Sequence, residues 1–123
     1  MLDTGGLPDV LPGWLTSADL DYFVGEFPRG GFRGPLNWYR NLDRMWERTR
    51  FLTGAKLRQP MLFAAGEKDV VVEMYRPAVN AMPYTCADLR VNKLLPGVGH
   101  WIQQERPTEV NELLLGFLSE LKN

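Results

Sequence analysis

The chain has 123 residues, of which 45% are hydrophobic and 24% charged, proportions that are typical of a soluble globular domain. Its net charge of −1 at pH 7 gives no argument for binding nucleic acid or an anionic membrane. No apolar run approaches the length of a membrane span, and the N-terminus lacks the basic and then apolar order of a secretory signal. The single cysteine, Cys86, excludes an intramolecular disulfide, so we expect a small apolar side chain there and a cytoplasmic location.

The first half of the chain predicts a loop and two helices. Residues 1–13 are rich in Gly and Pro and predict the loop. Thr16 and Asp19 have the spacing of a capping box, and a helix should follow over residues 17–27. A second helix, with an unusual number of aromatic residues, is predicted over residues 36–51. The apolar face of the first helix consists of Leu20, Phe23, Val24 and Phe27.

The second half alternates between strands and helices. Apolar runs predict strands over 60–65 and 89–95, with a helix over 73–82 between them and a last helix that begins at Pro107. This order implies parallel strands joined by helical crossovers. The last helix should pack an apolar stripe on the sheet. That stripe comprises Val110, Leu113, Leu114, Phe117, Leu118 and Leu121.

Two strands are too few for an independent α/β sheet, because parallel strands pair on both sides and need both faces covered. We therefore expect the chain to be the C-terminal part of a larger protein. An isolated chain of this kind should self-associate or remain loosely packed.

Asp69 and His100 carry the strongest chemical signal. Each follows one of the two predicted strands after a short turn, and His100 is the only histidine of the chain. A carboxylate and a histidine at the exits of two strands are typical of the acid–histidine half of a catalytic triad. In the α/β-hydrolase order a nucleophile precedes both, and these 123 residues contain no nucleophile elbow.

Other interpretations of these residues remain open. Asp69 alone would fit an Asx turn, and a lone histidine is by default a structural residue. Glu67 is a nearby competitor for the role of the acid, and Asp88 is a remote one. These acids and the histidine do not have the spacing of metal ligands, so we expect neither a metal nor a cofactor.

Two longer segments resemble one known family. The run GFRGPLNWYRN at residues 31–41 and the run GHWIQQERP at residues 99–107 resemble segments of the soluble epoxide hydrolases of the α/β-hydrolase superfamily. Residues 14–16 and 19–22 resemble the late cap helix of the same family, so the resemblance covers nearly the whole chain. It implies an α/β fold in which residues 1–53 form the end of the helical cap and residues 54–123 the last two parallel core strands with their helices.

The resemblance also implies a mechanism. In that family an aspartate attacks an epoxide carbon, two cap tyrosines hydrogen-bond the epoxide oxygen, and water activated by a histidine hydrolyses the resulting ester to a diol. Carried over by motif, Tyr39 is one of the two tyrosines, Asp69 the acid and His100 the base. A positioned phenol suits an oxygen that gains negative charge, and histidine titrates near neutrality, as a base for water requires.

Several expectations accompany this assignment. Trp38 and Trp101 should contact the substrate, a small epoxide, or line the seam between cap and core. The chain alone should be inactive because it lacks the nucleophile segment, and its remaining partner would be the rest of the hydrolase fold. The alternatives are another α/β-hydrolase, such as a haloalkane dehalogenase or an esterase, and a non-catalytic truncated or interaction protein.

Overall fold

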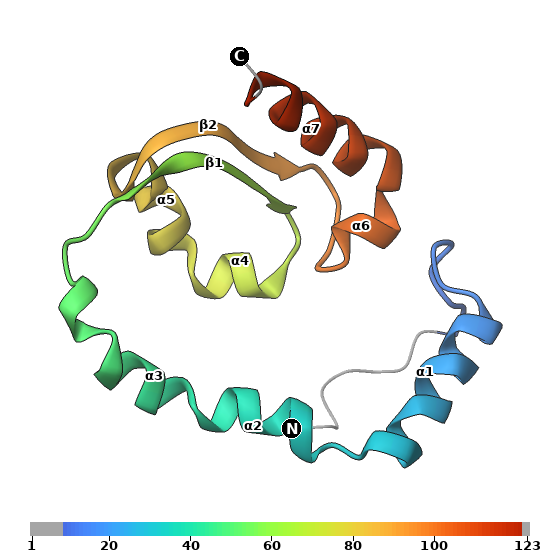
Figure 1. Cartoon of the computed structure of the whole chain (residues 1–123). Coiled ribbons are helices and arrows are strands. Elements are labelled where there is room, and N and C mark those ends of the chain that lie inside the picture. The colour runs from blue at the N-terminus through green and yellow to red at the C-terminus, as the bar shows by residue number, and fades with distance from the viewer. Residues whose placement is uncertain (1–8, 122–123) are drawn as a thin grey trace. The chain divides into compact units, whose positions relative to one another are not determined.

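The computed structural model describes residues 9–121, which fall into two compact units, one up to Phe51 and the other from Leu52 onward (Figure 1). The predicted loop at residues 1–13 lies mostly outside the described residues. None of the described helices is long and apolar enough to cross a membrane. Each unit is described separately below.

The first unit begins with helix α1 (Ser17–Gly30). The predicted capping box is confirmed: the Asp19 N–H donates to Oγ1 of Thr16 (3.1 Å), and the Thr16 N–H donates to Oδ2 of Asp19 (2.9 Å). The helix continues past the predicted end at residue 27 and terminates at Gly31, whose φ of 66° is readily adopted only by glycine. This turn stacks the ring of Phe32 on that of Phe27, with ring centroids 4.5 Å apart.

The predicted single helix over residues 36–51 is wrong in detail, because the chain forms α2 (Arg33–Arg40), α3 (Leu42–Arg48) and a 3₁₀ turn η1 (Arg50–Leu52). The break falls at Asn41, whose side-chain amide donates to the carbonyl oxygen of Asn37 (2.7 Å). An asparagine that bonds the backbone in this way competes with the helical hydrogen bonds. None of these helices contains a buried residue.

The second unit is built on two parallel strands, β1 (Leu57–Gly66) and β2 (Cys86–Leu95). Two helices connect them, α4 (Val70–Met74) and α5 (Arg76–Thr85), and they lie on one side of the sheet (Figure 1). The parallel pairing and the helical crossover confirm the prediction, but the single helix predicted over 73–82 is wrong in its bounds, because two helices meet at Tyr75. Both strands begin three residues earlier than predicted, because backbone pairing extends into less apolar sequence.

After β2 the chain forms a short helix, α6 (Ile102–Glu105), which was not predicted, and the last helix, α7 (Pro107–Glu120), which starts at Pro107 as expected. The core of this unit comprises Leu95, Val98, Ile102 and Val110, with Ala64 and Leu113 packed against it. Of the predicted stripe on α7, Val110 is buried and Leu113 and Phe117 are half-buried. The rest of that stripe is exposed among the described residues, namely Leu114, Leu118 and Leu121.

Candidate functional site

Two turns meet at the carboxyl ends of the strands, one after β1 and one after β2. The N–H of Glu67 donates to the carbonyl of Leu95 (3.0 Å), and the N–H of Lys68 donates to the carbonyl of Val98 (2.9 Å). The Glu67 carboxylate in turn accepts a hydrogen bond from the N–H of Gly97 (3.0 Å). These bonds connect the two turns directly, so residues that follow β1 and β2 come close in space.

Gly66 allows this close approach. A β-carbon placed on Gly66 would lie 2.7 Å from the carbonyl carbon of Val98 and closer still to the carbonyl oxygens of Val98 and Gly99. Those atoms are backbone and cannot move aside as a flexible side chain would. Only glycine at this position lets the two turns pack together.

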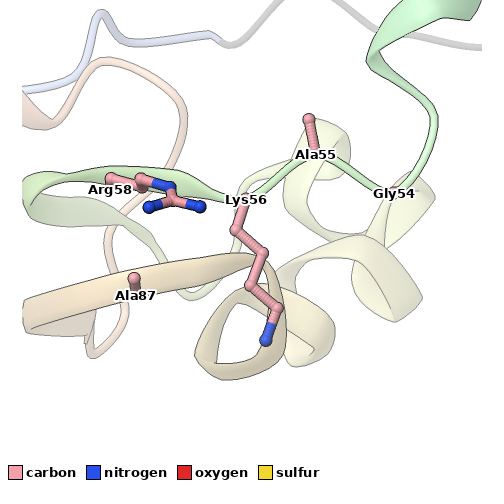
Figure 2. A pocket seen from close by; sticks show the side chains of 5 residues that line it. All are labelled: Gly54, Ala55, Lys56, Arg58 and Ala87. Atoms are coloured by element: carbon pink, nitrogen blue, oxygen red, sulfur yellow. The ribbon is translucent and has the colours of Figure 1, made fainter.

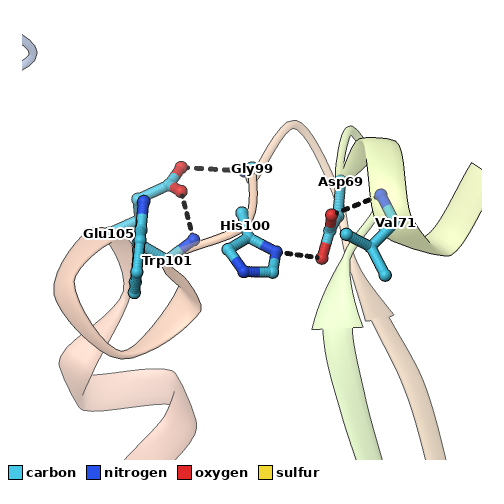
Figure 3. Close-up of polar contacts among 6 residues, drawn as sticks. All are labelled: Asp69, Val71, Gly99, His100, Trp101 and Glu105. Carbon is cyan, nitrogen blue, oxygen red and sulfur yellow. Dashed lines mark hydrogen bonds and ion pairs between the residues drawn. The ribbon is translucent and has the colours of Figure 1, made fainter. Parts of the chain in front are cut away.

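The turns bring Asp69 and His100 together, as Figure 3 shows. Nδ1 of His100 lies 2.9 Å from Oδ2 of Asp69, while Oδ1 of Asp69 accepts a hydrogen bond from the N–H of Val71 (2.8 Å). Asp69 is thus the N-cap of α4 and the partner of the imidazole at once. The carboxylate is buried, with 8% of its side chain exposed, whereas half of the His100 side chain is exposed. The imidazole therefore has one nitrogen held by protein and a face open to solvent.

The electrostatics of the pair favour a charged Asp69. Burial acts to raise the pKa of the Asp69 carboxyl group, but the hydrogen bonds from Val71 and His100 and the charge on His100 outweigh burial. The pKa of Asp69 consequently lies below its usual value. A carboxylate that stays ionised can orient the imidazole and stabilise its protonated form.

The other two acids considered for this position do not contact His100. Glu67 bonds the Gly97 N–H, as described above. Asp88 lies on β2, at the opposite end of the strand from the turn, and forms an ion pair with Arg90 (3.2 Å). Of the three, the structure brings only Asp69 to the histidine.

The aromatic residues singled out in the sequence lie in both units. Trp101 contacts His100 edge-on, with ring centroids 5.1 Å apart and an interplanar angle of 80°, and it is half exposed. Trp38 and Tyr39 lie on α2 in the first unit, and both are largely exposed. Cys86 is buried at the start of β2, consistent with a small apolar residue.

Glu105 is a residue of the site that the sequence reasoning missed. Its carboxylate accepts hydrogen bonds from the N–H groups of Gly99 (2.8 Å) and Trp101 (3.2 Å), the two neighbours of His100 (Figure 3). The signal in the sequence was an acidic residue five positions after the histidine and two before Pro107. That signal could have suggested a bond to the backbone at the start of a short helix.

A cavity lies away from this pair, at the end of the sheet where the strands begin (Figure 2). Its lining carries two cationic side chains, Lys56 and Arg58, and no carboxylate or histidine. The Asp69–His100 pair lies instead at the carboxyl ends of the strands, where ligands of α/β sheets usually bind. Over residues 9–121, no three His, Cys, Asp or Glu side chains come together as metal ligands would.

Known proteins with similar sequences are epoxide hydrolases. The chain is 45% identical over 119 residues to Epoxide hydrolase A of Mycobacterium tuberculosis, covering 94% of this chain and 35% of that protein. It is 37% identical over 111 residues to Bifunctional epoxide hydrolase 2 of Rattus norvegicus, covering 88% of this chain and 19% of that protein. No protein-family model matches the chain.

Solved structures that are similar to the chain are also epoxide hydrolases. An epoxide hydrolase from an endophytic Streptomyces superimposes with a TM-score of 0.88 at 49% identity, covering 93% of this chain and 34% of that one. Epoxide Hydrolase A from Mycobacterium thermoresistibile gives a TM-score of 0.85 at 48% identity, covering 91% of this chain and 34% of that one. The chain spans about a third of the length of the first of these relatives. By sequence and by fold, the chain is similar to the epoxide hydrolases of the α/β-hydrolase fold and matches part of that fold, consistent with its C-terminal portion.

Proposed function

We propose that these residues supply the acid–base pair and one epoxide-binding tyrosine of an epoxide hydrolase. The observation that carries the proposal is the hydrogen bond of 2.9 Å between Asp69 and the only histidine, at the carboxyl ends of two parallel strands. The similarity to epoxide hydrolases over more than nine-tenths of the chain supports the same reaction. Residues 1–53 would then be the end of the cap and residues 54–123 the last part of the core.

His100 acts as the base of the second half-reaction. Its Nδ1–H donates to the Asp69 carboxylate, which leaves Nε2 unprotonated and able to take a proton from water. The resulting hydroxide attacks the carbonyl carbon of the alkyl–enzyme ester, and the ester bond from that carbon to the alkyl oxygen breaks. The departing alkoxide takes the proton that the hydroxide brought, so the diol leaves and the nucleophile returns to its carboxylate form. Half of the His100 side chain is exposed, so water can reach it.

Tyr39 acts in the first half-reaction. A carboxylate nucleophile, supplied by chain outside these residues, attacks an epoxide carbon and breaks the bond from that carbon to oxygen. The oxygen gains negative charge, and the phenol of Tyr39 hydrogen-bonds it and gives it a proton. The cycle closes when the proton that His100 took from water returns through solvent to the tyrosinate. Trp38 and Trp101 would supply apolar contacts for the substrate, a small epoxide. The whole enzyme would act in the cytoplasm without a cofactor.

A hybrid enzyme tests the proposal. In it, these 123 residues replace the matching segment of Epoxide hydrolase A of Mycobacterium tuberculosis, and that parent protein is the positive control. We expect the hybrid to convert styrene oxide to its diol. His100→Gln should form the covalent ester and fail to hydrolyse it, so intact-protein mass spectrometry should show an adduct that persists.

Tyr39→Phe should have the opposite effect and slow formation of the ester on the order of 10²-fold, or less where a second tyrosine compensates. No adduct should accumulate in this variant. Tyr84→Phe is the matched control, since Tyr84 is an exposed tyrosine of α5, away from the turns that carry Asp69 and His100. A hybrid that turns over substrate while His100→Gln shows no adduct would exclude the covalent mechanism or the assignment of His100.

A further inference from the structure

Glu105 bonds the backbone on both sides of His100. Its Oε2 accepts a hydrogen bond from the Gly99 N–H (2.8 Å) and its Oε1 accepts one from the Trp101 N–H (3.2 Å). Figure 3 shows the carboxylate facing these two amides, with the imidazole between Glu105 and Asp69. One side chain thus holds the residue before the histidine and the residue after it.

These two bonds fix the torsions that aim the imidazole. The Gly99 N–H belongs to the peptide plane before Gly99, and the Trp101 N–H belongs to the plane after His100. Between the two planes lie only the φ and ψ angles of Gly99 and His100. Gly99 has no side chain to restrict its own backbone, so these angles need an outside constraint.

The packing shows that the contact is close. A β-carbon on Gly99 would lie 3.0 Å from Oε1 of Glu105, tighter than an ordinary contact. Glu105 itself is half-buried, and across residues 9–121 its carboxylate has no ion-pair partner. A carboxylate accepts stronger hydrogen bonds than a neutral group does. The bonds from the Gly99 and Trp101 N–H groups to Glu105 should therefore be strong.

We propose that Glu105 is a positioning residue for the hydrolytic half-reaction: it holds the backbone of His100 so that Nδ1 stays on Asp69 and Nε2 faces the attacking water. This inference rests on the proposed function, and it adds a third group to the pair of Asp69 and His100. Glu105 does not contact the reacting atoms. Its effect reaches them through the direction of the imidazole, where a displacement of about 1 Å can cost on the order of 10²-fold in rate.

The kinetic test separates positioning from folding. In the hybrid enzyme, Glu105→Ala should slow hydrolysis of the covalent ester roughly 10- to 100-fold and leave the rate of ester formation unchanged, so the ester accumulates. Glu105→Gln keeps one acceptor oxygen and should recover part of the loss. Glu109→Ala is the matched control, because this carboxylate lies one turn further on and its ion-pair contact is with Arg106 (3.7 Å). Equal loss in both half-reactions, or no loss in Glu105→Ala, would overturn the proposal.

A second measurement, NMR of the hybrid enzyme, does not depend on activity. His100 is the only histidine of the 123 residues, and its imidazole signals in the hybrid are assigned by their absence in His100→Gln. We expect a downfield Nδ1–H proton that reports the bond to Asp69 in the wild type and in Glu109→Ala, and its loss or broadening in Glu105→Ala. Circular dichroism shows whether Glu105→Ala folds. If it does not fold, Glu105→Gln is used instead, and we expect its Nδ1–H signal to be weaker than that of the wild type.

The two measurements distinguish the possible failures. A hybrid without diol formation, together with loss of the Nδ1–H signal in Glu105→Ala, would reject the proposed function and retain the role of Glu105 in holding His100. An active hybrid with an unchanged signal and unchanged ester hydrolysis in Glu105→Ala would reject the role of Glu105 alone. Absence of the Nδ1–H signal from a folded hybrid without substitutions would contradict the geometry on which the role of Glu105 depends.

Discussion

At the scale of single residues, Asp69 has two tasks, and each of its carboxylate oxygens serves one. Oδ1 caps α4 through the Val71 N–H, and Oδ2 holds His100. The helix cap holds the carboxylate in place independently of the histidine. The hydrogen bond to His100 therefore costs little further side-chain entropy of Asp69. Substituting Asp69 with asparagine keeps a good capping residue and removes the charge.

The lowered pKa of Asp69 predicts how stability depends on pH. Since the carboxyl has a lower pKa in the folded chain than its reference value of 3.8, its contribution is fully present above that value and is lost as pH falls through the folded pKa. We expect the melting temperature of the hybrid enzyme to fall more steeply below about pH 4 than that of its Asp69→Asn variant. Thermal unfolding followed by circular dichroism from pH 6 to pH 2.5 measures the difference.

Asp19 serves as an independent check on this prediction. Its pKa is also lowered, chiefly by the hydrogen bond from the Thr16 side chain, so Asp19→Asn should remove a separate part of the same acid transition. The effects of the two substitutions should add, because the residues share no partner. Parallel melting curves for the wild type and Asp69→Asn would show that the hydrogen bonds from Val71 and His100 do not lower the pKa of Asp69 in the folded protein.

The sequence pointed to Asp69 and His100 because each follows a strand, and parallel strands end at the same edge of a sheet. It could not point to Gly66 or Glu105 in the same way. The role of Gly66 depends on the backbone of another segment passing close to it, and such a contact has no local pattern. Glu105 acts on backbone N–H groups, which every residue type except proline carries.

At the scale of helices and strands, the starts were more predictable than the ends. The capping box at Thr16 and the proline at 107 confirm two helix starts, since both signals act locally. The break at Asn41 depends on one side-chain hydrogen bond that competes with a regular helix. The extra residues at the start of each strand pair through backbone atoms alone, so the hydrophobic pattern does not reveal them.

Substitution by alanine should change stability in opposite directions at two glycines, Gly66 in β1 and Gly116 in α7. Gly66→Ala should destabilise the hybrid enzyme by about 1–3 kcal/mol, because the new β-carbon overlaps the backbone of the opposite turn. Gly116→Ala should stabilise it by about 0.5–1 kcal/mol, since Gly116 lies inside α7 with open space where a β-carbon would be. Urea unfolding followed by circular dichroism gives both values.

The same pair of variants reports on the site. Gly66→Ala should also weaken the Nδ1–H signal of His100, because the two turns move apart, whereas Gly116→Ala should leave that signal intact. If Gly66→Ala were as stable as the wild type with its histidine signal unchanged, the close packing of the two turns would be wrong.

At the scale of the whole chain, the exposed apolar surface predicts self-association. Within the described residues the sheet has two strands, so each strand has an edge without a partner, and part of the α7 stripe is exposed. We expect the isolated chain to form oligomers or a loosely packed state. Sedimentation velocity over a range of concentrations, with near-ultraviolet circular dichroism, tests this, and a sharply melting monomer with strong aromatic signals would contradict it.

The chain by itself should not hydrolyse epoxides. His100 and Asp69 act on an ester that only a nucleophile can form, and these residues contain no nucleophile elbow. Incubation with styrene oxide should therefore give no more diol than buffer alone. Diol formation that is lost in His100→Ala would show that the 123 residues hold a nucleophile we have not recognised.

The hydrogen bonds that connect the two turns have a further consequence for ester hydrolysis. Attack of water on an ester produces a tetrahedral intermediate with an oxyanion, which enzymes usually stabilise with free backbone N–H groups. Around Asp69 and His100 many of these groups already donate within the unit. They are the amides of Glu67, Lys68, Asp69, Val71, Gly97, Val98, Gly99 and Trp101. Because these eight amides already donate to protein acceptors, they are not available to an oxyanion, and its donors should come from other N–H groups.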